Sequence, residues 1–168
     1  MNAGVAGRPD RRLFSFGLAL AAAVIVLDQL TKWYMVDVVM APPRVIEVTP
    51  FFNLVMTWNR GVSFGMLGDE SGAGSWLLSL VAAAIVAGLV FWLRRADRPI
   101  LAVALGLVIG GALGNVIDRL RLGAVADFLD FHLAGYHWPA FNLADSAITV
   151  GVIALVVPSL FPGRKLPK

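Results

Sequence analysis

Residues 110–131 read GGALGNVIDRLRLGAVADFLDF, a segment in which an apolar helix gives way to amide and charged side chains. With Gly106 before them, Gly110 and Gly114 form a ridge of small residues at four-residue spacing. Such a ridge allows the backbone of a second helix to approach closely in a membrane. We interpret it as a packing feature of a membrane helix.

Composition supports a membrane location for the whole chain. Its 168 residues are 58% hydrophobic and 15% charged, with positive mean hydropathy, which lies outside the usual range of soluble domains. A membrane-spanning helix needs roughly 20 apolar residues. Four stretches approach that length, although the last is short: 13–39, 76–93, 100–117 and 147–161. We therefore predict an all-α membrane fold with four transmembrane helices, forming a single membrane-embedded domain over residues 1–168.

The basic residues predict the orientation of these helices. Nine of the 14 lysines and arginines fall into three groups on one side, namely Arg8, Arg11, Arg12, Arg94, Arg95, Arg98, Arg164, Lys165 and Lys168. The positive-inside rule makes that side cytoplasmic, with both termini, so that segments 40–75 and 118–146 face outward. Alternatively, Arg11-Arg12 begins a cleavable twin-arginine signal. Because the apolar run continues through Leu27, we favour a retained span.

The first outward segment has strand-like character. Residues 44–56 contain the β-branched and aromatic runs RVIEV and FFNLVM, separated by Thr49-Pro50, which predicts a small extracytoplasmic β-platform. The sequence Asn59-Arg60-Gly61 predicts a turn, and residues 68–74 predict a flexible linker.

Several charged residues lie at the outer ends of the predicted spans. Asp28 and Lys32 are four residues apart, so they can pair on one face of a helix. The pair either has a purely structural role or helps to orient an active site. For Asp118 and Arg119 we expect a structural salt bridge or an anchor at the interface.

Asp127 and Asp145 form the strongest candidate site. Asp127 has apolar neighbours in sequence, and Asp145 directly precedes the fourth predicted span, so both carboxylates reach the same membrane face. If two carboxylates meet in a poorly hydrated place, one retains its proton, as aspartic peptide hydrolysis requires. Asn115, Asn142 and Arg119 are candidate supporting residues. Asp130 is the main rival to Asp127.

Other functional classes receive less support. The chain has no cysteine, and His132 and His137 lack the spacing of a zinc protease, so we expect no metal and no cofactor. A net charge of +3, widely scattered, gives no indication of nucleic-acid binding. A proton-coupled carrier with Asp28 and Lys32 as its relay remains an alternative, as does a non-catalytic assembly factor using the glycine ridge. No internal repeat of the carrier kind is visible.

Five motifs in order resemble the lipoprotein signal peptidase family, the type II signal peptidases of bacteria. They are LDQLTK at 27–32, NRGVSF at 59–64, GALGN at 111–115 with Asp118-Arg119, VADF at 125–128, and FNLADS at 141–146. The likeness extends over residues 26–151.

This resemblance implies a four-span enzyme of the bacterial inner membrane with Asp127 and Asp145 as catalytic aspartates. The implied substrate is a prolipoprotein whose cysteine already carries diacylglycerol, cut just before that cysteine. The implied active site is at the outer face, in contact with membrane lipids, with a mobile lid near Gly68 and a monomer as the working unit. The implied supporting residues are Asp28, Lys32, Asn59, Gly61, Asn115, Arg119 and Asn142.

Overall fold

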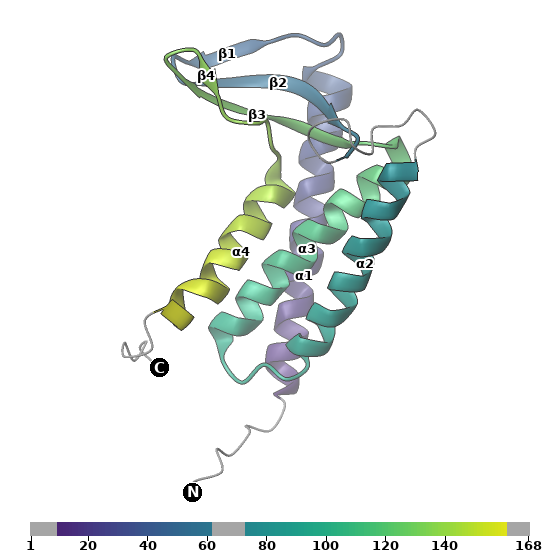
Figure 1. The fold of residues 1–168 in the computed structure, drawn as a ribbon, viewed down its shortest axis with the longest axis vertical. Coiled ribbons are helices and arrows are strands. Elements are labelled where there is room, and N and C mark those ends of the chain that lie inside the picture. Colours follow the sequence, from purple (N-terminus) through teal and green to yellow (C-terminus); the bar gives the residue numbers. More distant parts are fainter. Residues whose placement is uncertain (1–9, 62–72, 161–168) are drawn as a thin grey trace, which may run out of the picture.

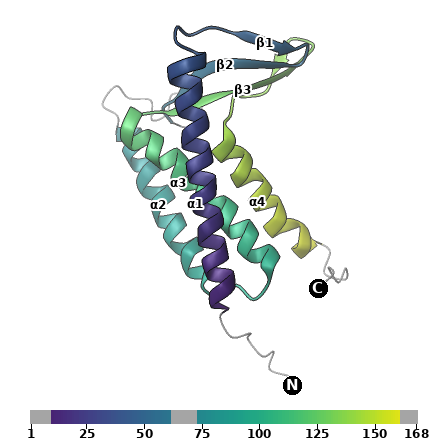
Figure 2. The same cartoon turned by 180° about the vertical axis from the view of Figure 1, so that it is seen from behind.

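A computed structural model of the protein describes residues 10–61 and 73–160 (Figure 1). Four helices form a bundle, and a small sheet lies across one end of it (Figures 1 and 2). The helices are α1 (Arg11–Tyr34), extended by the π-helical turn η1 (Met35–Val39), α2 (Ala73–Leu93), α3 (Pro99–Leu122) and α4 (Leu143–Leu160). The strands are β1 (Ile46–Thr49), β2 (Phe52–Asn59), β3 (Val125–Leu133) and β4 (Tyr136–His137).

Three of the helices are long and apolar enough to cross a bilayer. These are α1 with η1, α2 and α3, whereas the apolar part of α4 is shorter, at Leu143–Val157. Large apolar side chains on the outer surface of the bundle are exposed, among them Leu27, Leu80 and Ile153. In a membrane protein such a surface faces lipid, since lipid tails are as apolar as these side chains. The predicted all-α membrane fold with a small β-platform is thus confirmed.

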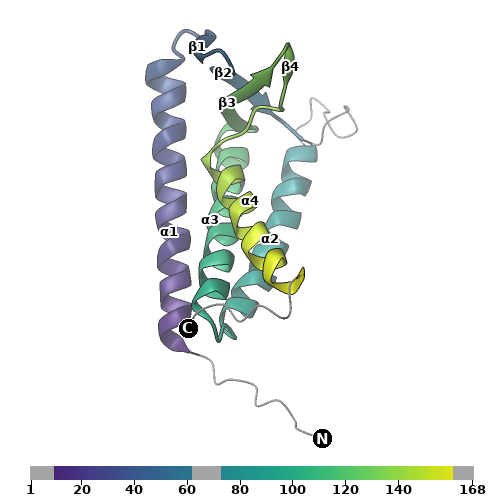
Figure 3. The ribbon, with the colours of Figure 1, turned by 90° about the vertical axis from the view of Figure 1, so that its left-hand side faces the viewer.

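Helix α3 is central, since α1, α2 and α4 all pack against it (Figure 3). The glycine ridge makes this packing possible on the side of α1. A Cβ atom at Gly106 would lie 2.7 Å from the main-chain oxygen of Gly17, and one at Gly110 would lie 2.7 Å from that of Ala21. On the side of α4, a Cβ atom at Gly111 would meet the main-chain oxygen of Ala144. The backbones of α1 and α4 therefore both lie close to the backbone of α3.

The sheet is antiparallel, in the order β1-β2-β3-β4. Strands β1 and β2 lie where the sequence predicts them. Strands β3 and β4 come from the second outward segment, for which we predicted no strands. The chain turns at Gly123, which caps the end of α3 with a φ of 74°, a conformation that glycine adopts without strain. Beyond it the chain extends, and Asp127 lies opposite Thr57 of β2.

Several helix boundaries differ from prediction, and α3 continues to Leu122, beyond its predicted end at residue 117. Helix α4 begins at Leu143, four residues before the predicted start at Ala147, because Asn142 and Asp145 bond each other's main chain at its first turn. Ala73 and Gly74 belong to α2 instead of the predicted linker. The rest of that linker, with the lid expected near Gly68, lies outside the described residues.

Candidate active site

Helix α4 starts with a reciprocal pair of hydrogen bonds. The main-chain N–H of Asp145 donates to Asn142 Oδ1 at 3.0 Å, and the main-chain N–H of Asn142 donates to Asp145 Oδ2 at 3.3 Å. This capping-box arrangement satisfies N–H groups that the start of a helix leaves without partners. It holds the Asp145 carboxylate in the first turn of α4, turned back toward Asn142.

The carboxylate of Asp127, on β3, is held by two side-chain amides. Asn142 Nδ2 donates to Asp127 Oδ1 at 2.7 Å, and Asn59 Nδ2 donates to Asp127 Oδ2 at 3.2 Å. The N–H of Gly61 donates to Asn59 Oδ1 at 3.2 Å, within the predicted turn. An amide whose oxygen is so bound presents its nitrogen to the carboxylate. The turn at residues 59–61 thus orients a donor toward Asp127.

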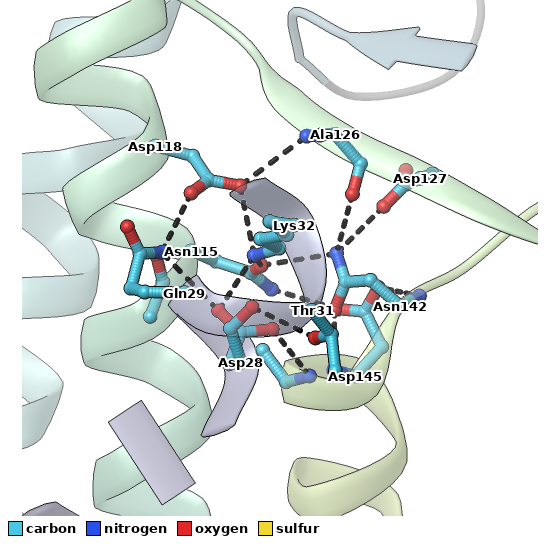
Figure 4. A network of polar contacts seen from close by, with 12 residues as sticks. Asp28, Gln29, Thr31, Lys32, Asn115, Asp118, Ala126, Asp127, Asn142 and Asp145 are labelled. Carbon is cyan, nitrogen blue, oxygen red and sulfur yellow. Dashed lines mark hydrogen bonds and ion pairs between the residues drawn. The ribbon is translucent and has the colours of Figure 1, made fainter. Parts of the chain in front are cut away.

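Asn142 contacts both carboxylates of the predicted pair, and it is fully buried. Figure 4 shows Asp127 and Asp145 on either side of this amide, on β3 and α4. Asn115 of α3 completes the arrangement. Its Nδ2 donates to Asp145 Oδ1 at 2.7 Å, and its Oδ1 accepts from Asn142 Nδ2 at 3.2 Å. Two neutral amides therefore connect residues from α3, β3 and α4.

A second set of charges lies beside this pair. Lys32 Nζ is 2.8 Å from Asp28 Oδ2 and 2.8 Å from Asp118 Oδ2, and all three side chains are buried. The predicted pairing of Asp28 with Lys32 is confirmed. Asp118 pairs with Lys32 of α1 and not with Arg119, because Arg119 is its neighbour on α3 and points elsewhere.

Both acids in this second set also bind main chain beside the predicted pair. Asp28 Oδ1 accepts from the N–H of Ala144 at 3.0 Å, and Asp118 Oδ2 accepts from the N–H of Ala126 at 3.2 Å (Figure 4). Ala144 immediately precedes Asp145, and Ala126 immediately precedes Asp127. The ion-paired residues therefore fix the backbone from which each aspartate of the pair extends.

Burial changes the acidity of Asp127. It is 2% exposed, and desolvation together with the charge of Asp145 raises its pKa to about 6. Hydrogen bonds from Asn59 and Asn142, and the charge of Lys32, act in the opposite direction and are outweighed. Asp127 thus holds a proton to a higher pH than an ordinary aspartate.

Arg119 approaches the site from the end of α3. One terminal nitrogen, Nη1, donates to the main-chain oxygen of Asn115 at 3.4 Å. Its buried Nε has no hydrogen-bond partner among the described residues. The carboxylates of Asp145, Asp127 and Asp118 act electrostatically on its charge. Arg119 therefore retains an unused donor close to the pair.

Asp130 is not part of the pair, and Gln29 makes a contact in the site that we did not predict. Asp130, the rival to Asp127, directs its carboxylate toward Asn53 and His137. Gln29 was not predicted, yet its Nε2 donates to Asp118 Oδ1 at 2.8 Å. Its position next to Asp28 on a buried helix face is the signal that would have identified it. Within residues 10–61 and 73–160, no group of three or more acidic or histidine side chains is arranged to hold a metal ion.

The fold and the site define a class, the polytopic membrane proteins with a carboxylate pair at one end of the helix bundle. A family model described as signal peptidase (SPase) II matches residues 20–161. The chain therefore belongs to the signal peptidase II family, and this membership makes it a peptidase.

Individual relatives agree over most of the chain. A lipoprotein signal peptidase from Methylorubrum extorquens (strain PA1) is 46% identical over 157 residues, covering 92% of this chain and 91% of the relative. One from Paraburkholderia phytofirmans (strain DSM 17436 / LMG 22146 / PsJN) is 50% identical over 146 residues, covering 85% and 83%. A solved structure described as a bacterial membrane enzyme is similar with a TM-score of 0.76 at 32% identity, covering 92% of this chain and 93% of that one.

Proposed function

We propose that this chain is an aspartic endopeptidase that removes signal peptides from diacylglyceryl-modified prolipoproteins by cutting just before the lipidated cysteine. Asp127 and Asp145 are the catalytic residues in this proposal. The observation that carries it is that one buried residue, Asn142, bonds both carboxylates: its side-chain amide donates to Asp127, and its main-chain N–H donates to Asp145. Two carboxylates bound to the same buried residue are held near each other and cannot both ionise comfortably.

The proposed chemistry assigns different roles to the two acids. Asp145 acts as the general base and takes a proton from a water molecule as the water oxygen attacks the scissile carbonyl carbon. Asp127, with its raised pKa, donates its proton to the carbonyl oxygen. When the resulting tetrahedral intermediate collapses, the carbon–nitrogen bond breaks and the amine leaves with the proton that Asp145 had taken. The hydroxyl proton returns to Asp127.

The neighbouring residues support this reaction by orientation and binding. Asn59, fixed by Gly61, and Asn115 hold the two carboxylates from the sides away from Asn142. Arg119, with its unused Nε–H, is suited to bind a carbonyl oxygen of the substrate backbone. Asp28 and Lys32 have no direct part in the reaction and fix the backbone near Asp145.

The position of the pair fits a substrate anchored in the membrane. The pair lies where the helices meet the sheet, at the end opposite the start of α1 and the end of α4 (Figures 1 and 4). Basic residues mark that opposite end as cytoplasmic, so the pair is at the outer face of the bacterial inner membrane. A lipidated signal peptide lies in the bilayer and presents its cleavage site at this level. We expect the enzyme to act as a monomer.

The test replaces Asp127 and Asp145 separately with Asn and measures cleavage of a lipid-modified precursor in detergent or in membranes. Each variant should lose nearly all activity while remaining inserted in the membrane. The matched control is Asp37→Asn, an exposed aspartate in η1, which should retain full activity. Retained cleavage by Asp127→Asn or Asp145→Asn would remove that residue from the mechanism, and retention by both would favour the non-catalytic assembly factor.

A further inference from the structure

Asp130 is a buried carboxylate that the proposed reaction does not use. It is 5% exposed, and Asn53 Nδ2 donates to its Oδ2 at 3.1 Å. His137 Nδ1 lies 2.9 Å from both of its oxygens. Desolvation raises the pKa of Asp130, but the hydrogen bonds from His137 and Asn53 outweigh it, so that the net pKa is below the ordinary value. Asp130 is therefore ionised and accepts the N–H of His137.

This contact lies inside the stretch of chain that connects the two catalytic aspartates. Asp130 follows Asp127 by three residues on β3, and His137 is on β4, beyond the hairpin. From His137 the chain returns along β3 before it enters α4 with Asn142 and Asp145. The geometry of the catalytic pair thus depends on how the return segment, residues 138–142, lies against β3.

The return segment is joined to β3 by main-chain hydrogen bonds. Near the hairpin, the N–H of Trp138 donates to the oxygen of Phe131 at 2.8 Å. Closer to the site, Phe141 exchanges bonds with Leu129, at 3.1 Å and 2.9 Å. The next residue is Asn142, whose side-chain amide donates to Asp127 and whose main-chain N–H donates to Asp145. The segment is therefore hydrogen-bonded to β3 both near the hairpin and next to the catalytic pair.

At the hairpin end of this segment the main-chain pairing with β3 is short, and side-chain contacts add to it. Strand β4 has two residues, both exposed, and a strand so short is weak by itself. The ring of His132 stacks on that of His137 with centroids 4.8 Å apart. The bond from His137 to a buried, ionised carboxylate is charge-assisted, which makes it stronger than a bond between neutral groups.

We propose that the Asp130–His137 contact is a clasp that positions the return segment and, through it, Asn142 between the catalytic carboxylates. This inference rests on the proposed function. Asp130 and His137 are positioning residues that act through Asn142. Loss of the clasp leaves the substrate-binding groups in place but loosens the geometry of the pair, so it lowers kcat and not substrate affinity.

The first test replaces His137 with Ala and with Asn and measures kcat and KM for the lipid-modified precursor. His137→Ala should lower kcat on the order of tenfold with KM unchanged, because small misplacements at a distance are costly for catalysis. His137→Asn has an amide nitrogen near the place of Nδ1 and should restore most of kcat. The matched control is Tyr136→Ala, its exposed neighbour on β4, which should behave as the parent protein.

The second test is a double-mutant cycle with Asp130→Asn, which preserves the shape of the side chain. If the clasp acts as a unit, the double variant Asp130→Asn/His137→Ala should be no slower than the slower single variant. Unchanged kcat in His137→Ala, equal loss in His137→Asn, or additive losses in the double variant would each overturn the clasp. If Asp127→Asn is inactive while His137→Ala is normal, only the clasp fails. If Asp127→Asn is active, the proposed function fails.

Discussion

Two groups of acids lie side by side in this protein, and they are stabilised in different ways. Asp28 and Asp118 share the ammonium group of Lys32 at 2.8 Å each. Asp127 and Asp145 are held by the amides of Asn142, Asn59 and Asn115, and in the described part of the chain no ion pair joins either of them to a cation. One group is in direct contact with a cation, and the other is in direct contact with neutral amides.

This difference has a chemical consequence. A carboxylate in direct contact with an ammonium group makes charge-assisted bonds, so it is a firm structural anchor. A carboxylate held by neutral amides next to a second acid keeps an adjustable proton, as the raised pKa of Asp127 indicates. The paired group is thus suited to hold backbone, and the unpaired group to exchange protons.

The largest effect on the unpaired group is expected from Asn142→Ala. This change removes the donor to Asp127 and the acceptor for the N–H of Asp145, so cleavage should fall on the order of a hundredfold. Loss of the cap should cost the helix only about 1 kcal/mol, so the protein should still fold. Steady-state cleavage and thermal unfolding separate these effects. Ser146→Ala, which removes a bond to the same residue, is the control and should stay active.

Lys32→Met tests the ion-paired group. The variant buries two carboxylates without their cation, and breaking a buried pair in this way costs about 3–5 kcal/mol. The thermal unfolding midpoint in detergent should fall markedly, whereas the same change at exposed Arg44 should leave it unchanged. Asp28→Asn should destabilise less, since its amide oxygen can still accept the N–H of Ala144. An unaltered midpoint in Lys32→Met would remove the distinction between the two groups.

The pH dependence of cleavage sharpens the comparison. With a pKa of about 6, Asp127 is protonated below that pH and loses its proton as the pH rises, so cleavage should decline on the alkaline side. The bond from Asn59 lowers this pKa. Asn59→Ala should therefore raise the pKa and move the alkaline decline to higher pH, as a pH–rate profile would record. A move to lower pH would contradict this account, although the profile reports the pair and not one residue.

The smallest effect is expected from chelators. If a metal ion lay between Asp127 and Asp145, its charge would offset theirs, and removal of the metal would abolish cleavage. We expect EDTA to leave cleavage of the lipid-modified precursor unchanged. Inhibition by EDTA that added zinc reverses would contradict the expectation.

The apolar architecture could be predicted from the sequence because its signals are local. Long apolar runs predict the three long helices, and the glycine spacing predicts the face of α3 that meets α1. The pairing of Asp28 with Lys32 follows from their positions on one helix turn. Each of these inferences needs only residues that are near one another in the chain.

The remaining features depend on contacts between distant residues. Strand β3 exists because β2 lies beside it, and its sequence, VADFLDFHL, has no regular alternation that would predict a strand. Asp118 pairs with Lys32, which is on a different helix, α1. The sequence around Asp118 offers only its neighbour Arg119 as a partner, so this pairing could not be predicted. The early start of α4 could have been predicted, since Asn142 and Asp145 have the three-residue spacing of a capping box.

Gly111 shows how finely the reactive end of the molecule depends on a remote contact. A Cβ atom at this position would meet the main-chain oxygen of Ala144, the residue before Asp145. One methyl group at position 111 would push the first turn of α4 outward and carry Asp145 with it, while every polar group remained chemically intact. The position of Asp145 thus depends on the absence of a methyl group from the neighbouring helix.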